Sequence, residues 1–305
     1  MQEWELPSTI ETNSLNFSLS LYNTSMKIVF FGSGYYTIPI VKELQNKGLC
    51  LIVTNENDGE LEKYAHSENI PFLCTNFKKK SDIEIVKTYS PELGILASYG
   101  AFIPKEIIDH FPMGILNIHP SLLPKYKGPS PIQFTILNGD TVSGVSVIQL
   151  DEKIDHGPIV AQKEVKITSN ADLKTLTELL FQEGSLLIKE IIQYIEKVKK
   201  IDSIPQSTKN ETWTQKIEKQ NGKIDLSNPP EKDKLLRKIR AFYPWPGVYL
   251  TVSLGKKNKL LKLMPNDMVQ VEGKKPMSYN DFINGYGNDA VTILQKLNLH
   301  DNQFK

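Results

Sequence analysis

Asn117 and His119 are the two residues of this 305-residue chain whose types and spacing first suggest chemistry. They close the apolar run "GILNIH", residues 114–119, and Pro120 follows at once. Side chains two residues apart on a strand point to the same face, so the amide and the imidazole reach one point. Pro120 favours extended geometry at His119 and ends the strand there, and a polar pair in that place is costly unless it is used. A histidine that only caps the strand is the structural alternative.

A second polar stretch follows about one strand later, in "QLDEKIDHGPIVAQ", residues 149–162. Here an apolar strand runs into a turn that carries Asp151, Glu152, Asp155, His156 and Gly157. In a parallel sheet the carboxyl ends of neighbouring strands lie side by side, so a carboxylate from this turn can reach His119. Asp155, which a Gly-Pro turn follows, is the best placed candidate. Surface loops often hold unpaired Asp residues, so the spacing alone leaves both interpretations open.

The elements that must position these residues follow an alternating pattern from Met26 onward. Apolar runs of strand length are "KIVFFG", "CLIVTN", "ELGILAS", "GILNIH" and "VSVIQL". Between them lie stretches with helical spacing, namely "IPIVKELQNKG", "EKYAHSENI", "SDIEIVKTYS" and "SPIQFTILNGD", and a longer helical pattern covers residues 172–200. This order predicts an α/β fold: a Rossmann-like, mostly parallel sheet with helices on both faces, which binds ligands at the carboxyl ends of its strands.

A second, smaller domain is predicted beyond residue 220. Residues 203–220 have the composition of a linker, and "EKDKLLRKIRAF" is the pattern of a short basic helix that "YPWPG" stops. From Val248 onward, apolar and polar residues alternate between glycine turns, which predicts antiparallel strands in a small OB-like β-barrel. We therefore expect an unstructured leader at 1–25, a catalytic domain at 26–202, a linker at 203–220 and a β-barrel domain at 221–305.

Composition and charge exclude several classes of protein. Lys and Arg total 36 against 35 acidic residues, so no global field draws the chain to polyanions or membranes, and an RNA partner would need a local patch. No apolar run approaches the ~18 residues of a membrane helix, and residues 1–25 hold no Lys or Arg, unlike targeting peptides. The five histidines are scattered, and Cys50 and Cys74 lie far apart. We expect a soluble, cytoplasmic monomer without a metal.

The chain resembles the formyltransferases that use 10-formyltetrahydrofolate in two stretches, "NIHPSLLPKYKGPSPIQFTILNGD" and "GVSVIQLDEKIDHGPIV". That family shows Asn-x-His, then Ser-Leu-Leu-Pro and a Gly, and later Asp-x-Gly. "ASYGAFIPKEII" is similar to its folate-side loop. Similarity to the C-terminal domain of the members that act on methionyl-tRNA lies in "NGKIDLS", "IRAFYPWPG" and "VQVEGKKPMSYNDFINGY". The resemblance extends from Met26 to about Tyr286.

The resemblance implies a reaction and a role for each residue in it. A formyl group would pass from 10-formyltetrahydrofolate to the free amino group of initiator methionyl-tRNA through a tetrahedral intermediate. Asn117 and a protonated His119 would donate hydrogen bonds to its oxyanion, at roughly 3 kcal/mol per donor. Asp155 would favour the imidazolium and order a water through which the amine loses its proton.

The same resemblance assigns the binding residues. On the folate side it implies Tyr99, Gly100, Ile103, Ser121, Leu122, Leu123 and Pro124. For the RNA it implies a basic track that includes Lys125, Lys127, Arg237 and Arg240. Two departures predict weaker or differently placed RNA contacts: the loop "TNENDGELEKY" at 54–64 is short and acidic, and Lys127 stands where the family usually has Arg.

Two alternatives to this function stay open. The acceptor could be a nucleotide-linked amino sugar, because sugar-nucleotide formyltransferases share the "PWPG" element. A catalytically silent RNA-binding relative is the other alternative. Against it stand Asn117, His119 and Asp155, because a silent relative has no chemical reason to retain all three.

Overall fold

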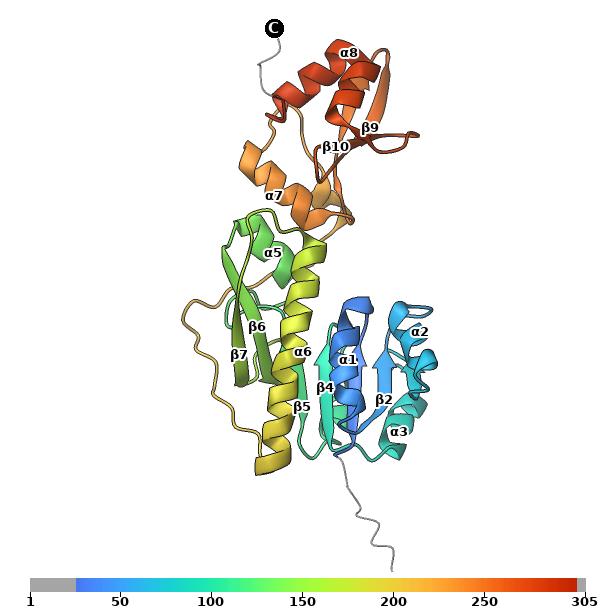
Figure 1. Ribbon diagram of the computed structural model, residues 1–305, viewed down its shortest axis with the longest axis vertical. Coiled ribbons are helices and arrows are strands. Elements are labelled where there is room, and N and C mark those ends of the chain that lie inside the picture. Colours follow the sequence, from blue (N-terminus) through green and yellow to red (C-terminus); the bar gives the residue numbers. More distant parts are fainter. Residues whose placement is uncertain (1–25, 301–305) are drawn as a thin grey trace, which may run out of the picture.

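The computed structural model describes residues 26–300, so the predicted leader at 1–25 lies outside the described residues. A seven-stranded sheet forms the first domain, in the order β3-β2-β1-β4-β5-β6-β7 (Figure 1). Its strands are β1 Ile28–Gly32, β2 Leu49–Thr54, β3 Phe72–Cys74, β4 Leu93–Ala97, β5 Ile115–His119, β6 Val142–Gln149 and β7 Ile159–Lys166. Strands β1 to β5 pair in parallel, and β6 and β7 pair antiparallel, so the predicted mostly parallel sheet is confirmed.

Helices cover both faces of this sheet, as predicted. They are α1 Ile38–Gln45, α2 Glu60–Ser67, α3 Lys80–Thr88, α4 Lys105–Ile108, α5 Pro131–Asn138 and α6 Leu173–Val198. Because successive side chains of a strand point to opposite faces, β1 gives Ile28 and Phe30 to one core and Val29 and Phe31 to the other. Helices α1 and α6 complete the first core, and α3 and α4 complete the second.

Strands β3 and β7 and helix α4 were not predicted, although every predicted strand and helix of the first domain is present. β3 has three residues and α4 has four, which is too short for a periodic pattern. β7 is an edge strand whose sequence, "IVAQKEVK", is largely exposed in its second half. Its apolar residues were therefore too few to reveal it.

Helix α6 packs against strand β5. It spans 26 residues and begins at a capping box between Asp172 and Thr175. At Gly184 the helix lies so close to β5 that an added Cβ would be 2.8 Å from Cγ2 of Ile118. Ile118 lies between Asn117 and His119 on β5. The absence of a side chain at Gly184 therefore lets α6 pack closely against the part of β5 that carries both residues.

The second domain contains an antiparallel sheet in the order β11-β10-β9-β8, consistent with the predicted small barrel. Its elements are α7 Lys232–Phe242, β8 Val248–Leu254, β9 Lys257–Met264, β10 Met268–Val271, β11 Met277–Ser278 and α8 Tyr279–Lys296. The expectation of strands from Val248 onward was wrong for residues 279–296, because α8 consists of two helical segments joined by a kink at Gly287. Its first turn is capped by the Ser278 hydroxyl, which accepts from the Asp281 amide at 3.1 Å.

The two domains meet where α7 packs on α5 and on the start of α6 (Figure 1). Two arginines of α7 bridge this contact through their Nε atoms. Arg237 donates to the carbonyl of Leu137 at 3.1 Å, and Arg240 donates to the carbonyl of Ala171 at 3.2 Å. Within residues 26–300, no helix combines the length and the apolar character that crossing a membrane requires.

An extended segment, residues 201–214, returns along the β7 side of the first domain after α6 (Figure 1). We call it the strap. Ile204 and Ile159 of β7 exchange two backbone hydrogen bonds, at 2.7 and 2.8 Å. Further on, Lys127 pairs with the strap through the amide of Thr214 at 2.7 Å and the carbonyl of Thr212 at 2.9 Å. Much of the predicted linker is therefore bonded to the first domain.

We predict that Gly184→Val destabilises the protein by about 1–3 kcal/mol, because overpacking pushes α6 away from β5. Chemical denaturation measures the free energy of unfolding. Gly285→Ala in α8 is the matched control, since open space surrounds its added Cβ, and it should be neutral or stabilising by up to ~1 kcal/mol. An unchanged free energy of unfolding in Gly184→Val would contradict the close packing.

Candidate active site

Three side chains meet at the carboxyl end of β5. Asn117 Nδ2 donates to Asp155 Oδ1 at 3.3 Å, and His119 Nδ1 lies 3.5 Å from the same oxygen. The backbone amide of Gly128 donates to Asp155 Oδ2 at 2.8 Å. Asn117 and His119 are buried, and the Asp155 side chain is only 11 % exposed. A carboxylate with so little access to water needs partners, and these groups supply them.

The route by which Asp155 reaches β5 differs from the predicted one. β5 and β6 were expected to be parallel, but they are antiparallel, with Leu116 opposite Gln149. The reason is the position of α5, which lies at the carboxyl end of β5 beside the second domain (Figure 1), so that the chain enters β6 from that end. The loop 150–158 must therefore come back along β5 to bring Asp155 to His119.

The backbone around Asp155 explains the Asp-x-Gly pattern. Asp155 has a φ of 47°, in the left-handed region that Asp tolerates better than most residues. At Gly157 an added Cβ would lie 1.7 Å from the carbonyl oxygen of Gln149, so no side chain fits there. The first residue turns the loop, and the second lets it approach the end of β6.

The second ring nitrogen of His119 has a partner of its own. Nε2 lies 3.0 Å from the carbonyl oxygen of Tyr126. A carbonyl oxygen only accepts, so Nε2 carries a hydrogen in this contact. Nδ1 faces a carboxylate oxygen, so a doubly protonated ring satisfies both acceptors, whereas a neutral ring satisfies one. This arrangement can hold and release a proton beside the Asn117 amide.

The three side chains lie on the wall of a cavity of about 1040 Å³. Tyr99, Gly100 and Ile103, which were predicted on the folate side, line the same cavity. Much of the remaining wall is apolar, with Leu96, Phe102, Ile108, Ile118, Leu150 and Ile154. The far side is formed by α6 and by the "YP" turn of the second domain. A cavity of this size and lining suits an organic ligand with flat apolar faces.

Two tyrosines of the cavity remain neutral at physiological pH. Burial and the hydrogen bond to Glu178 raise the pKa of Tyr35 to about 12. Burial also raises the pKa of Tyr99, whose hydroxyl donates to the carbonyl of Thr75 at 2.6 Å. A phenol with a raised pKa is a poor base near neutral pH. Neither of these two phenols is therefore a proton acceptor for the reaction near neutral pH.

Residues 121–124, also predicted on the folate side, do not line this cavity. They form a turn that is bonded to β6. Ser146 Oγ donates to the carbonyl of Ser121 at 2.6 Å and accepts from the amide of Leu123 at 2.9 Å. Ser121 Oγ donates to the carbonyl of Lys125 at 2.6 Å. In the structure this turn sets the path of the chain after β5.

The four predicted RNA contacts all have partners within the chain. Lys125 Nζ lies 2.8 Å from Asp140, and its side chain is 46 % exposed. Lys127 is 1 % exposed, with Nζ 3.2 Å from Glu211 and above the ring of Trp213. Hydrogen bonds from Lys127 and Trp213 lower the pKa of the Glu211 carboxyl, so this contact is an ion pair at neutral pH. The two arginines join the domains, as described above.

Gln206 of the strap belongs to the site, although the sequence did not predict it. Its Nε2 donates to the carbonyl of Asp155 at 2.9 Å and to that of Gly157 at 2.8 Å. A single glutamine in a segment of linker composition has no periodic or motif signal. Its partners are backbone atoms about 50 positions away, so only the three-dimensional structure reveals the contact.

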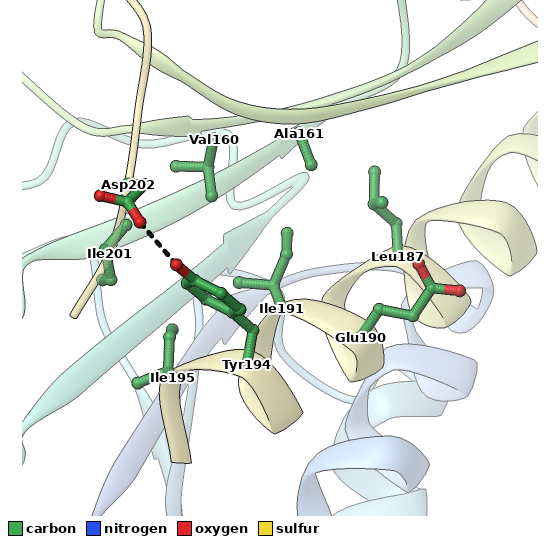
Figure 2. A pocket seen from close by; sticks show the side chains of 9 residues that line it. All are labelled: Val160, Ala161, Leu187, Glu190, Ile191, Tyr194, Ile195, Ile201 and Asp202. Carbon is green, nitrogen blue, oxygen red and sulfur yellow. Dashed lines mark hydrogen bonds between the residues drawn. The ribbon is translucent and has the colours of Figure 1, made fainter. Parts of the chain in front are cut away.

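A second pocket, of about 280 Å³, lies between α6, β7 and the start of the strap (Figure 2). Its lining residues are Val160, Ala161, Leu187, Glu190, Ile191, Tyr194, Ile195, Ile201 and Asp202. The Tyr194 hydroxyl donates to Asp202 at 2.6 Å across one side of it. No predicted site residue lines this pocket. In the part of the chain that the structure describes, no group of three His, Cys, Asp or Glu side chains is arranged to hold a metal ion.

Two family profiles match the chain. The profile described as "Formyl transferase" matches residues 26–192, and "Formyl transferase, C-terminal domain" matches residues 216–268. The chain therefore belongs to the formyl transferase family, and it is an enzyme that transfers formyl groups.

The methionyl-tRNA formyltransferase of Thermodesulfovibrio yellowstonii is 32 % identical to this chain, in an alignment that covers 86 % of this chain and 96 % of that protein. The methionyl-tRNA formyltransferase of Thermus thermophilus is 29 % identical, with 86 % and 97 % covered. The similarity to both relatives thus extends over nearly their whole length.

Solved structures share the fold. A 4-N formyltransferase from Francisella tularensis superimposes with a TM-score of 0.62, covering 79 % of this chain and 98 % of that chain at 20 % identity. WlaRD, a sugar 3N-formyl transferase, gives a TM-score of 0.59, covering 82 % and 99 % at 20 % identity. At these identities the likeness concerns the fold alone.

We predict that His119→Ala and Asp155→Asn each lower the rate of formyl transfer at least ~100-fold, because one variant removes a donor and the other removes its charged partner. The rate is measured with methionyl-tRNA, the acceptor in the names of the two relatives above. Circular dichroism checks that the variants stay folded. His156→Ala is the control from the same loop, since its ring is bonded to Asp151 at 2.7 Å and not to the site. Full activity in His119→Ala would remove the imidazole from the chemistry.

Proposed function

We propose that this chain transfers the formyl group of 10-formyltetrahydrofolate to the free amino group of initiator methionyl-tRNA. The observation that carries the proposal is the meeting of Asn117, His119 and Asp155 on the wall of the large cavity. Relatives named for this reaction are similar to the chain over both of its domains, which supports the choice of acceptor.

The donor fits the apolar part of the cavity. Tyr99, Gly100 and Ile103 follow β4 and line the cavity, where their backbone groups are available to a pterin. Organic ligands need such apolar faces together with a few placed polar groups. When bound, 10-formyltetrahydrofolate supplies the formyl group. Residues 121–124 would contribute indirectly, by fixing the turn that leads to Gly128.

Asn117 and His119 act on the formyl oxygen. As negative charge develops on it, the N–H of the Asn117 amide that does not face Asp155 donates to this oxygen, and the Nδ1–H of His119 turns to it from the 3.5 Å contact with Asp155, each donor contributing about 3 kcal/mol. Asp155 stabilises the protonated ring of His119 and, through one water, takes the proton that the attacking amine loses. The same groups return a proton to the nitrogen from which the formyl group departs. No covalent bond to the enzyme is needed.

The acceptor reaches the site from between the two domains. Lys174 of α6 lines the cavity on that side, as do Tyr243 and Pro244 of the second domain. Tyr243 is 38 % exposed, and exposed aromatic rings can stack on the bases of a single-stranded nucleic acid. A slender 3′ arm that carries the amino acid suits this entrance.

RNA phosphates require cations that are not already used within the protein. Because Lys125 is paired with Asp140, Lys127 is buried and the two arginines join the domains, we assign the RNA contacts to the exposed lysines where β8 turns into β9, Lys256 and Lys257. Binding that depends on phosphate contacts weakens steeply as salt rises.

We predict that the protein formylates charged initiator tRNA and not a nucleotide-linked amino sugar. Each acceptor is incubated with 10-formyltetrahydrofolate, and the formylated product is measured, with His119→Ala as the blank. Raising the salt from 50 to 200 mM should weaken tRNA binding by at least about tenfold, because several phosphate contacts are lost together.

The outcomes separate the three candidate functions. Formylation of the sugar alone would contradict the proposed acceptor. Binding of tRNA without formylation of either acceptor would favour the catalytically silent RNA-binding relative. The chemistry of the site would then need another explanation.

A further inference from the structure

The loop that carries Asp155 has little internal support. Residues 150–158 form neither helix nor strand, and Asp155 itself is in the left-handed region, with a φ of 47°. The contact of the His156 ring with the Asp151 carboxylate, at 2.7 Å, joins two exposed or half-exposed side chains. Exposed ion pairs of this kind contribute little to holding a conformation. Groups outside the loop must therefore fix Asp155.

Gln206 is such a group. Its Nε2 donates to the carbonyl of Asp155 at 2.9 Å and to the carbonyl of Gly157 at 2.8 Å. An amide nitrogen carries two hydrogens, so both bonds can form at once. Its Oε1 is buried and has no hydrogen-bond partner among the described residues. The position of the side chain thus satisfies its two N–H donors and not its oxygen, and both donors bind the backbone of the loop.

The backbone of the strap is held in place on both sides of Gln206. Ile204, two residues earlier, exchanges two backbone hydrogen bonds with Ile159 of β7, at 2.7 and 2.8 Å. Six residues after Gln206, the carbonyl of Thr212 accepts from the amide of Lys127 at 2.9 Å. The strap is therefore bonded to the first domain on both sides of the glutamine, which limits its movement.

We propose that Gln206 is a positioning residue for formyl transfer, which holds the backbone of Asp155 so that its carboxylate lies between Asn117, His119 and Gly128. This inference rests on the proposed function, because Gln206 acts only through Asp155. Without the two donors, both carbonyls lose a partner and the loop gains freedom at its left-handed residue. A misplacement of about 1 Å in a catalytic group can cost on the order of 100-fold in rate.

Gln206→Met tests this role, because methionine has a similar length and no donor. We expect kcat to fall by about 10- to 100-fold. The KM values for both substrates should change less than about twofold, since Gln206 does not line the cavity. Gln270→Met is the matched control, because it removes a glutamine that donates to the carbonyl of Lys274 at 3.0 Å in the remote second domain. The control should keep the wild-type kcat.

A double-variant cycle separates positioning from a general structural effect. In the Asp155→Asn background the carboxylate is already gone, so Gln206→Met should change the single-turnover rate by less than about twofold. The midpoint of thermal unfolding, in contrast, should shift by the same amount with and without Asp155→Asn. Gln206→Leu also removes the N–H donors and adds no charge, and it provides the same comparison if the methionine variant does not fold.

Each outcome has a distinct meaning. A wild-type kcat in the Gln206 variants overturns the inference, and so does an equal fold loss in both Asp155 backgrounds. Full activity in Asp155→Asn alone contradicts the proposed function instead. The two failures can therefore be told apart.

Discussion

The Asp155 carboxylate is the point at which separate segments of the chain meet. Its Oδ1 faces Asn117 and His119 of β5, and its Oδ2 accepts from the amide of Gly128. A carboxylate with an 11 % exposed side chain is costly in free energy without such partners, so the folding of the loop and the formation of the site depend on each other. The proposed reaction needs donors and a proton acceptor around one carbon atom, and this contact brings the groups proposed for these roles together.

The strand period explains what the sequence could predict of this arrangement. Asn117 and His119 do lie together, because residues two apart on a strand share a face whatever the rest of the sheet does. Asp155 was predicted to reach His119 from the end of a strand parallel to β5. In the structure β6 is antiparallel to β5, and the loop after β6 returns along β5 to bring Asp155 to His119. Periodicity predicts faces and elements. It does not predict the path of an irregular loop between them.

Features that depend on distant contacts were not predictable from the sequence. Gln206 contacts backbone atoms, which leave no trace in residue types. Lysines are usually exposed, so nothing in the sequence indicated that Lys127 would be buried against Glu211. α8 follows the two-residue strand β11. The helical spacing of its apolar residues was not recognised, because the residues before it alternate between apolar and polar. Gln206 and Lys127 thus depend on tertiary contacts, whereas α8 follows a local pattern that the neighbouring strands obscured.

The coupling between Asn117 and Asp155 tests the central claim most directly. Single-turnover rates are measured for Asn117→Ala, for Asp155→Ala and for the variant that carries both substitutions. If the carboxylate holds the amide in place, the two residues act as a unit, and the double variant should be at most about threefold slower than the slower single variant. Rate losses that multiply, as they do for independent residues, would contradict this account.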